Sequence, residues 1–485
     1  MQLSKENLKK IAPLPDLSIP GEQLLSLPEK VLQFGTGVLL RGLPDYFIDK
    51  ANKQGIFNGR IVIIKSTTKG GTDAFDKQDG LYTLCIKGIE ENKTVEETII
   101  NASVSRVLSA NEEWKEILKC AHSSEMKLII SNTTESGIVS SDDDIHAAPP
   151  PSFPGKLLAF LYERYKAFKG SEESGMVIIP TELITHNGDK LFSIVIELAE
   201  KNKLENDFIQ WLKTANHFCN SLVDRIVPGK LPAADQEKAE EKLGYSDELM
   251  IMAEPFRLWA IESGSEKVKE VLSFSAIDDG VVITPDIEKF RELKLRMLNG
   301  THSFCCGLAV LAGFETVKDA MNDEQMLGFA RRLMMEEIAA AMDNNLVSHN
   351  EIYAFANKVV DRFRNPFLQH KWLSIAMNYT SKMRLRNISL LVRYFDKAGK
   401  VPECMALGFA AYLLFMKCRK ESDGNYYGQW HHHIYLIEDE TAAYFAGQWA
   451  SNDINKLVDE VLSNEGLWGA DLSILNGFSQ AIKKI

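Results

Sequence analysis

The feature that most constrains the fold is a series of short, mostly apolar runs separated by longer helical segments. Four such runs precede residue 181, each bounded by Gly, Asn, Thr or Pro. They are Val31–Phe34, Arg60–Lys65, Lys127–Ser131 and Met176–Pro180. A strand that is apolar on consecutive residues is buried on both faces, which is typical of a parallel sheet covered by helices. The first part of the chain therefore predicts an α/β domain.

Helical periodicity fills much of the remaining N-terminal part. The expected helices are Lys156–Phe168, Asp189–Glu200 and Asp207–Val223. The segment Ala147–Pro154 (AAPPPSFP) is too rich in proline for a helix, because proline lacks the N–H donor that a helix interior needs. We expect a loop there, within the domain.

From about Thr284 onward the strand signals disappear. Five segments carry helical periodicity: Ile287–Ala312, Asp323–Met342, Ser348–Phe363, Leu385–Lys397 and Glu403–Cys418. A chain of 485 residues is also too long for one hydrophobic core. We therefore predict two domains, an α/β domain over residues 1–283 and a mainly α-helical domain over residues 284–485.

Charge and hydropathy exclude several classes of function. The chain carries 55 Lys and Arg against 67 Asp and Glu, a net charge of −12, which argues against a generally basic nucleic-acid binder. The first thirty residues contain no apolar signal core, and the longest apolar runs are about half of the roughly 20 residues that span a membrane. We expect a cytoplasmic protein with no membrane or nucleic-acid partner.

The metal-binding residue types are poorly arranged for a metal site. The seven cysteines are irregularly spaced and form no C-x-x-C pair, so reduced thiols are expected. Three adjacent imidazoles, His431–His433, cannot all face one ion from a regular helix or strand. A polar loop or helix edge is the favoured interpretation of this run, and we predict no metal.

The first apolar run leads into Gly35-Thr36-Gly37. Glycines after a strand permit a tight turn and close approach of a pyrophosphate, which the next helix can bind through its N-terminal amides. The third glycine of the usual fingerprint is replaced by Leu40, so an ordinary turn is the alternative. The position of the Gly35-Thr36-Gly37 segment at the start of the α/β domain favours a Rossmann-type dinucleotide site. An acidic residue at the end of the second strand would bind the ribose hydroxyl of NAD, but none occurs here before Asp73. The residues alone therefore do not decide between NAD and NADP as the cofactor.

Lys294, Asn299 and His302 form the second candidate site. On an α-helix with about 100° per residue, all three can point to one side. A lysine can exchange a proton, an amide can stabilise a developing alkoxide, and an imidazole can orient the reacting oxygen. A solvated lysine, a capping asparagine and a core histidine are the alternative interpretation.

Three polar clusters remain. Residues 131–137 (SNTTESG) and 181–189 (TELITHNGD) each follow a strand, where ligand loops of open parallel sheets lie, although helix caps would use the same residue types. The third cluster concentrates five cations in an acidic protein: Arg362, Arg364, Lys382, Arg384 and Arg386. It is either a solvated basic face or a site for an anionic substrate.

Taken together, these segments resemble the mannitol dehydrogenase family of polyol-specific long-chain dehydrogenases. The K-x-x-x-x-N-x-x-H pattern at Lys294, Asn299 and His302 resembles the catalytic signature of that family. The other matching segments follow in the order of the family: QFGTGVLLRG (33–42), QDGLYT (78–83), SNTTESGI (131–138), IIPTELITHNGD (178–189), LVDRIVPG (222–229) and RFRNPFLQHKWLSIAMN (362–378).

The resemblance implies an NAD-dependent secondary alcohol dehydrogenase that works without a metal. By the same resemblance, Lys294 is the general acid/base, Asn299 stabilises the reacting oxygen and His302 orients the substrate hydroxyl. The implied cofactor residues are Phe34, Gly35, Thr36, Gly37, Arg41 and Asn132, and the implied substrate residues are Asn187, Asp224, Lys382 and Arg364.

The chain departs from the mannitol branch at two positions. Leu40 stands where that branch has a histidine, and Ser374 stands near its substrate arginine, whereas Lys382 is kept. The match is closer to the sugar-acid branch, which implies a hexuronate or aldonate as substrate. A non-catalytic NAD sensor would need the glycine loop but not the lysine, and a hydrolase using His431–His433 is a more distant alternative.

Overall fold

The computed structural model describes residues 1–66, 71–133, 136–342, 346–451 and 453–485. The chain forms two compact units. Unit 1 comprises Met1–Lys87 and Thr94–Ile287, and unit 2 comprises Gly88–Lys93 and Glu288–Ile485. The functional division at residues 283 and 284 remains a prediction.

A six-stranded parallel sheet with the order β6-β3-β2-β7-β8-β9 is the centre of unit 1. Its four inner strands confirm the predicted apolar runs. They are β3 (Arg60–Lys65), β2 (Glu29–Phe34), β7 (Leu128–Ser131) and β8 (Val177–Pro180), flanked by β6 (Val104–Ser109) and β9 (His217–Phe218).

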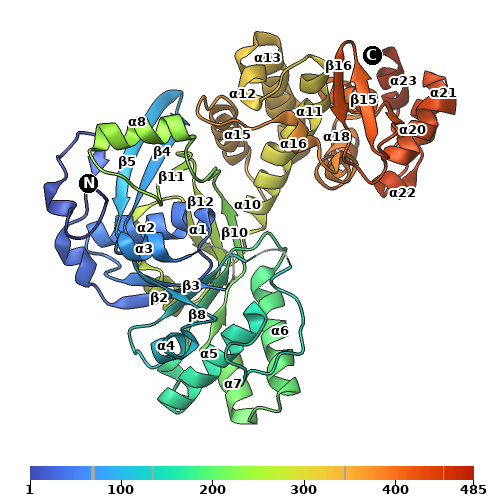
Figure 1. Cartoon of the computed structure of the whole chain (residues 1–485). Coiled ribbons are helices and arrows are strands. Elements are labelled where there is room, and N and C mark those ends of the chain that lie inside the picture. Colours follow the sequence, from blue (N-terminus) through green and yellow to red (C-terminus); the bar gives the residue numbers. More distant parts are fainter. Residues whose placement is uncertain (67–70, 134–135, 343–345, 452) are drawn as a thin grey trace. The chain divides into compact units, whose positions relative to one another are not determined.

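Successive residues of these strands enter different hydrophobic cores. In β2, Leu32 and Phe34 belong to one core and Val31 to the other, and β3 alternates in the same way. The first core is closed by helices that lie together in Figure 1, namely α4 (Trp114–Cys120), α5 (Phe153–Phe168), α6 (Asn187–Lys201) and α7 (Asn206–Ala215). Because both faces are covered, the inner strands are mostly apolar.

The second core lies under helix α2 (Pro44–Lys53) and two smaller sheets. One sheet has the order β1-β5-β4-β11 and the other β10-β12-β13. Their bounds are β1 (Leu17–Ser18), β5 (Lys93–Asn101), β4 (Tyr82–Glu90), β11 (Ile251–Ala253), β10 (Ser221–Asp224), β12 (Leu258–Glu262) and β13 (Val281–Thr284). The other α-helices of unit 1 are α1 (Val38–Gly42), α3 (Asp73–Lys77), α8 (Ala233–Leu243) and α9 (Glu266–Val271).

One predicted helix of unit 1 was too long. The expected helix Asp207–Val223 ends as α7 at Ala215, and strands β9 and β10 take up the rest. The Asn216 side chain accepts a hydrogen bond from Met176 N (3.0 Å), which joins this segment to β8. Pairing with the sheet therefore overrides the local helical pattern.

The five predicted helical segments of unit 2 are present, and the structure adds shorter helices between and after them. The segment Glu288–Leu311 is continuously helical, and its middle, η5 (Leu293–Gly300), has π-helical geometry between α10 (Glu288–Glu292) and α11 (Thr301–Leu311). The next helices are α12 (Val317–Asn322), α13 (Glu324–Arg332), η6 (Leu333–Ile338), α14 (Ala339–Met342), α15 (His349–Phe363), α16 (Trp372–Ala376), α17 (Tyr379–Met383), η7 (Arg384–Ile388), α18 (Ser389–Ala398) and α19 (Glu403–Phe415). Segments η6 and η7 are also π-helical.

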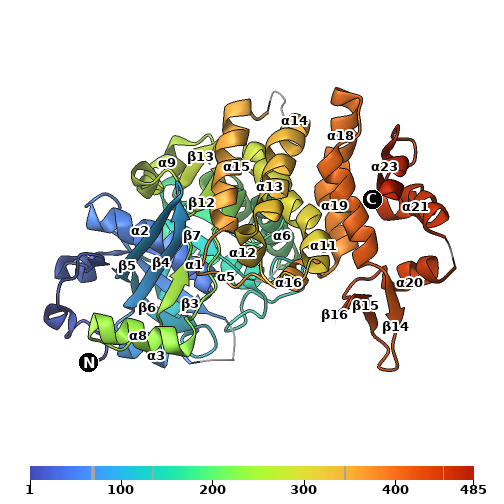
Figure 2. The ribbon, with the colours of Figure 1, turned by 90° about the horizontal axis from the view of Figure 1, so that it is seen from above.

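The expectation that strands end before residue 284 was wrong. A small antiparallel sheet follows α19, with strands β14 (Cys418–Lys420), β15 (Tyr426–Trp430) and β16 (His433–Leu436), beside α20 in Figure 2. These strands are short and largely exposed, so they lack a long apolar run. His431 and His432 form the tight turn of the second hairpin, with φ +50° at His431, and His433 begins β16. The last helices are α20 (Ala442–Ser451), α21 (Ile454–Leu462), α22 (Glu465–Trp468) and α23 (Phe478–Lys484).

Within the described residues, no helix is long and apolar enough to cross a membrane.

A buried arginine fastens the first core. The guanidinium of Arg164, on α5, is fully buried and donates hydrogen bonds to four backbone carbonyls. Its acceptors are Ser174 O (2.6 Å), Met126 O (2.8 Å), Ser123 O (2.9 Å) and Ala121 O (3.1 Å).

Arg164→Met should lower the free energy of unfolding by about 3 kcal/mol, because it leaves several buried carbonyls unpaired. Lys166→Met, an exposed change on the same helix, should cost less than about 0.5 kcal/mol. Equal unfolding midpoints for the two variants would contradict this account.

Candidate functional site

The glycine loop follows the carboxyl end of β2 and leads into α1. Gly35 has φ +128°, and a Cβ at this position would lie 3.0 Å from Asn132 O, so only glycine fits without strain. Gly37 is different: it is exposed, has φ −62°, and no described atom lies within 4 Å of a Cβ built there. The loop therefore has an open surface at Gly37, with Thr36 half-buried beside it. This arrangement fits the close approach of a pyrophosphate.

Two of the predicted cofactor residues lie beneath the loop. The Phe34 ring is fully buried against Phe153, at 5.0 Å between ring centroids, so its side chain forms the floor of the loop. The buried Arg41 donates from Nη1 to Leu249 O (2.7 Å) and lies over the Tyr82 ring. Both residues therefore fix the position of α1 and the loop.

The segment after β7 lies against the glycine loop. Asn132 donates from its backbone N to Phe34 O (3.1 Å) and from Nδ2 to Thr181 Oγ1 (2.9 Å). The buried carboxylate of Glu182 accepts hydrogen bonds from Ser131 Oγ (3.1 Å) and from Thr133 N (2.8 Å). These contacts hold the ends of β2, β7 and β8 in one arrangement. Glu182 was not singled out from the sequence, where it stood in a cluster explained equally well by helix capping.

Asn187 and Asp224, the predicted substrate residues of unit 1, are both buried. Asn187 Nδ2 donates to Pro180 O, Glu182 O and Ser221 O, and its Oδ1 accepts from the backbone N of Gly188 and Ser221. These bonds use the whole hydrogen-bonding capacity of the Asn187 amide. Asp224 ends strand β10, whose register pairs it with Leu258.

In unit 2, Lys294 and Asn299 both belong to the π-helical segment η5. On an α-helix, residues five apart lie about 140° apart, whereas the i→i+5 pattern of a π-helix brings them toward the same face. Both side chains are half-buried. The Asn299 carbonyl accepts hydrogen bonds from Ser303 Oγ (3.2 Å) and Arg386 Nη1 (3.4 Å), so this turn is held by its neighbours. Short π-helical turns inside α-helices are frequent at functional sites.

His302 lies one turn further along, enclosed by aromatic rings. It is 6% exposed and stacks on Phe363 (centroids 4.2 Å apart, 15° between planes), with the His370 ring 5.2 Å away edge-on. Burial, followed by the charges of His370, Arg386, Arg362 and Lys382, holds the pKa of His302 well below its ordinary value. The imidazole is therefore neutral near pH 7. Its Nε2 is buried and has no hydrogen-bond partner among the residues that the structure describes, which leaves one polar atom for a ligand.

Cations gather on the same side of unit 2. Lys382 donates from Nζ to Ile375 O (2.8 Å), and burial, then the charge of Arg386, lowers its pKa. Burial also lowers the pKa of Arg386, to about 10. In the neighbouring segment, the charge of Arg362 contributes to lowering the pKa of His302. Arg364 instead donates a hydrogen bond from Nη1 to Asn92 Oδ1 (3.5 Å). The structure thus brings Lys382 and Arg386 together near His302.

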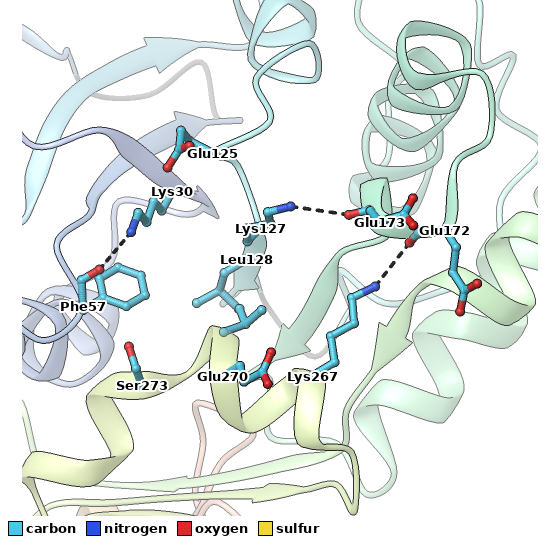
Figure 3. Close-up of a pocket in the computed structure, with 11 residues that line it drawn as sticks. Lys30, Phe57, Glu125, Lys127, Leu128, Glu172, Glu173, Lys267, Glu270 and Ser273 are labelled. Atoms are coloured by element: carbon cyan, nitrogen blue, oxygen red, sulfur yellow. Dashed lines mark hydrogen bonds between the residues drawn. The ribbon is translucent and has the colours of Figure 1, made fainter.

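A cavity of about 670 Å³ lies elsewhere, in unit 1 (Figure 3). It is lined by Lys30, Lys127 and Leu128, which mark the amino ends of β2 and β7, whereas the glycine loop follows the carboxyl end of β2. Lys127 and Lys267 reach the carbonyls of Glu173 (3.4 Å) and Glu172 (3.3 Å). Because dinucleotides bind at the carboxyl ends of parallel strands, this cavity is not the cofactor site.

Among the described residues, no group of three or more His, Cys, Asp and Glu side chains is placed to hold a metal ion. His431 and His432 lie in the turn between β15 and β16, and His433 is the first residue of β16.

A buried acid under the glycine loop should make the stability depend on pH. Asp45 is fully buried, and burial raises the pKa of its carboxyl group to about 8, although Gln33 Nε2 donates to it (3.4 Å). The folded protein then keeps a proton that the unfolded chain loses near pH 3.8. The free energy of unfolding should fall by up to about 1.4 kcal/mol per pH unit between pH 4 and 8, and then level off.

Asp45→Asn removes this proton without changing the shape of the side chain. The variant should match or fall below the native protein in stability near pH 4 and exceed it at pH 8. Thermal unfolding at the two pH values measures the difference, and parallel pH profiles for the two proteins would contradict the assigned protonation.

Comparison with known proteins places these features in a family. Residues 29–272 match the mannitol dehydrogenase Rossmann domain, and residues 286–484 match the mannitol dehydrogenase C-terminal domain. The chain is 38% identical over 458 residues to a protein of Halalkalibacterium halodurans named altronate oxidoreductase, covering 92% of this chain and 88% of that protein. A protein of the same name from Bacillus subtilis is also 38% identical, over 451 residues, covering 92% of this chain and 89% of that protein.

Two solved structures share the fold. One is Pseudomonas fluorescens mannitol 2-dehydrogenase in a complex with NAD and D-mannitol (TM-score 0.70, 22% identity, 100% of this chain and 96% of that chain). The other is a D-sorbitol dehydrogenase in substrate-free form (TM-score 0.78, 21% identity, 100% and 97%). With both family domains matched across most of its length, the chain belongs to the mannitol dehydrogenase family.

Proposed function

We propose that this protein is an NAD-dependent altronate oxidoreductase, which interconverts D-altronate and D-tagaturonate. The observation that carries this proposal is the 38% identity to relatives of that name over more than nine-tenths of the chain. The basic cluster near His302 supports an acidic sugar as the substrate. We also propose that residues 1–283 form the cofactor domain and residues 284–485 the substrate domain.

The glycine loop would hold the cofactor. Gly35 and Gly37 would allow the pyrophosphate to approach the backbone, Thr36 lies between them, and Phe34, Arg41 and Asn132 would keep the loop in place. When bound, NADH supplies the hydride that reduces the ketone. The filled hydrogen bonds of Asn187 favour a supporting role for this residue beside the site.

The catalytic residues would all come from the helix that contains η5. As the ketone carbon receives the hydride, its oxygen takes a proton from the Lys294 ammonium group and becomes a hydroxyl. The Asn299 amide would donate a hydrogen bond to that oxygen as negative charge develops. The neutral His302 would use its unpaired Nε2 to orient the oxygen. Oxidation of altronate reverses these transfers.

A substrate comparison tests the function. NADH oxidation by the purified protein is measured with tagaturonate, with fructuronate and with fructose. The proposal requires the highest kcat/KM with tagaturonate. A preference for fructuronate would indicate mannonate oxidoreductase instead, and NADH binding without turnover of any of the three would indicate a sensor.

Gly37→Val tests the cofactor loop. The backbone angles at Gly37 suit valine and the space around it is open, so the variant should fold. Its branched side chain would occupy the surface offered to the pyrophosphate, so NADH affinity should fall by at least about 100-fold. Fluorescence titration with NADH measures the affinity, and Gly447→Val, at another open glycine in unit 2, is the matched control. Undiminished affinity in a folded Gly37→Val variant would move the cofactor site elsewhere.

Lys294→Met tests the proton donor. Methionine keeps the bulk of the lysine stem and removes the transferable proton, so kcat should fall by about 10²–10⁴-fold while NADH affinity changes little. Lys289→Met, on the same helix and ion-paired with Glu351 (2.9 Å), is the matched control and should keep its activity. Near-normal turnover in Lys294→Met would place the proton donor elsewhere.

A further inference from the structure

We propose that Arg386, assisted by Lys382, binds the carboxylate of the substrate and selects sugar acids over neutral sugars. This inference rests on the proposed function, since it concerns the acidic end of the same substrate. Arg386 belongs to η7, and Lys382 belongs to α17 directly before it.

The first observation is a pair of neighbouring like charges. Lys382 and Arg386 are four residues apart on one helical segment, are half-buried, and form no ion pair with a carboxylate in the described part of the chain. Two cations in this spacing repel each other, and burial increases the repulsion. The nearby Asp439 attracts Lys382, but its oxygens already accept hydrogen bonds from Thr380 N (2.7 Å) and Thr441 N (2.9 Å). A bound anion would relieve the repulsion.

The second observation is the set of donors that Arg386 keeps free. Its Nη1 donates to Ser303 Oγ (3.1 Å) and to Asn299 O (3.4 Å), which fixes the guanidinium beside the catalytic turn. Its Nε and Nη2 have no hydrogen-bond acceptor among the described residues. A guanidinium held at one corner with its remaining N–H groups unused is suited to a forked contact with a carboxylate.

The third observation is that Arg386 adjoins the turn that carries the proposed catalytic residues. Its Nη1 contacts both Asn299 O (3.4 Å) and Ser303 Oγ (3.1 Å). In tagaturonate, three carbon atoms separate the ketone from the carboxylate, a span of about 5 Å with C–C bonds of about 1.5 Å. A substrate this short needs its carboxylate site close to the groups that hold its ketone, and Arg386 meets that requirement.

Arg384 offers a matched control on the same segment. Its side chain is exposed and donates from Nη1 to Gly466 O (3.4 Å), away from Asn299 and Ser303. It carries the same charge two residues from Arg386, so a variant at Arg384 reports the effect of net charge alone.

The experiment compares Arg386→Met, Arg386→Lys and Arg384→Met with two substrates, tagaturonate and its neutral counterpart D-tagatose, in which a hydroxymethyl group replaces the carboxylate. We expect Arg386→Met to lower kcat/KM for tagaturonate by roughly 10- to 100-fold, mainly through KM, and for tagatose by less than about 3-fold. Arg386→Lys should recover part of the loss, and Arg384→Met should leave both values unchanged. Thermal unfolding midpoints establish that each variant is folded.

The outcomes separate this inference from the proposed function. If the native protein reduces tagaturonate and Arg386→Met loses activity equally with both substrates, Arg386 only supports the turn at Asn299 and the inference is wrong. If Arg386→Met keeps its activity with tagaturonate, the carboxylate binds elsewhere. If the native protein does not reduce tagaturonate at all, the proposed function itself fails.

Discussion

The contact on which the arrangement of unit 2 depends is the one that Arg296 makes between two π-helical turns. Its guanidinium donates from Nη1 to the carbonyls of Leu385 and Arg386, both at 2.8 Å, and is ion-paired through Nε with Glu292 (3.2 Å). Segment η5 carries Lys294 and Asn299, and η7 carries Arg386. Because π-helical turns leave the regular hydrogen-bond ladder, their geometry needs such outside support. Arg296 is therefore a positioning residue rather than a cation that acts on the substrate.

In unit 1, too, the exposed residues of the site are supported by residues that lie beneath them. The exposed part of the glycine loop has almost no neighbours of its own, and the residues below it supply the rigidity: Phe34 in the core, Arg41 bonded to Leu249 O, and Asn132 bonded to Phe34 O. Glu182 extends this support to the segment after β7. Hydrogen bonds between buried groups are stronger than in water, so these contacts stabilise the position of the loop.

The sequence predicted the features that depend on local pattern. The inner strands of the parallel sheet were recognised because burial on both faces makes most of their residues apolar, and the helices of unit 2 were recognised by their periodicity. Strands β14–β16 were missed because they are short and largely exposed, and so lack the apolar run that marks a buried strand. The end of the helix at Ala215 depends on pairing with β8, which no local window contains.

The site was predictable only as residue types. The motif supplied Lys294, Asn299 and His302, but the assumed α-helical spacing overlooked the π-helical turn that brings the first two toward one face. The basic cluster was visible, yet charge counts cannot distinguish the exposed Arg384 from the half-buried Arg386. Burial and hydrogen-bond partners make that distinction, and both depend on contacts between distant segments.

The most direct test of the account is to follow a labelled hydride. Tagaturonate is reduced with NADH that carries deuterium at the transferable position, and the altronate formed is examined by NMR and mass spectrometry. The account predicts one deuterium per molecule, on the carbon next to the terminal hydroxymethyl group. Altronate without deuterium, or with deuterium on another carbon, would contradict it.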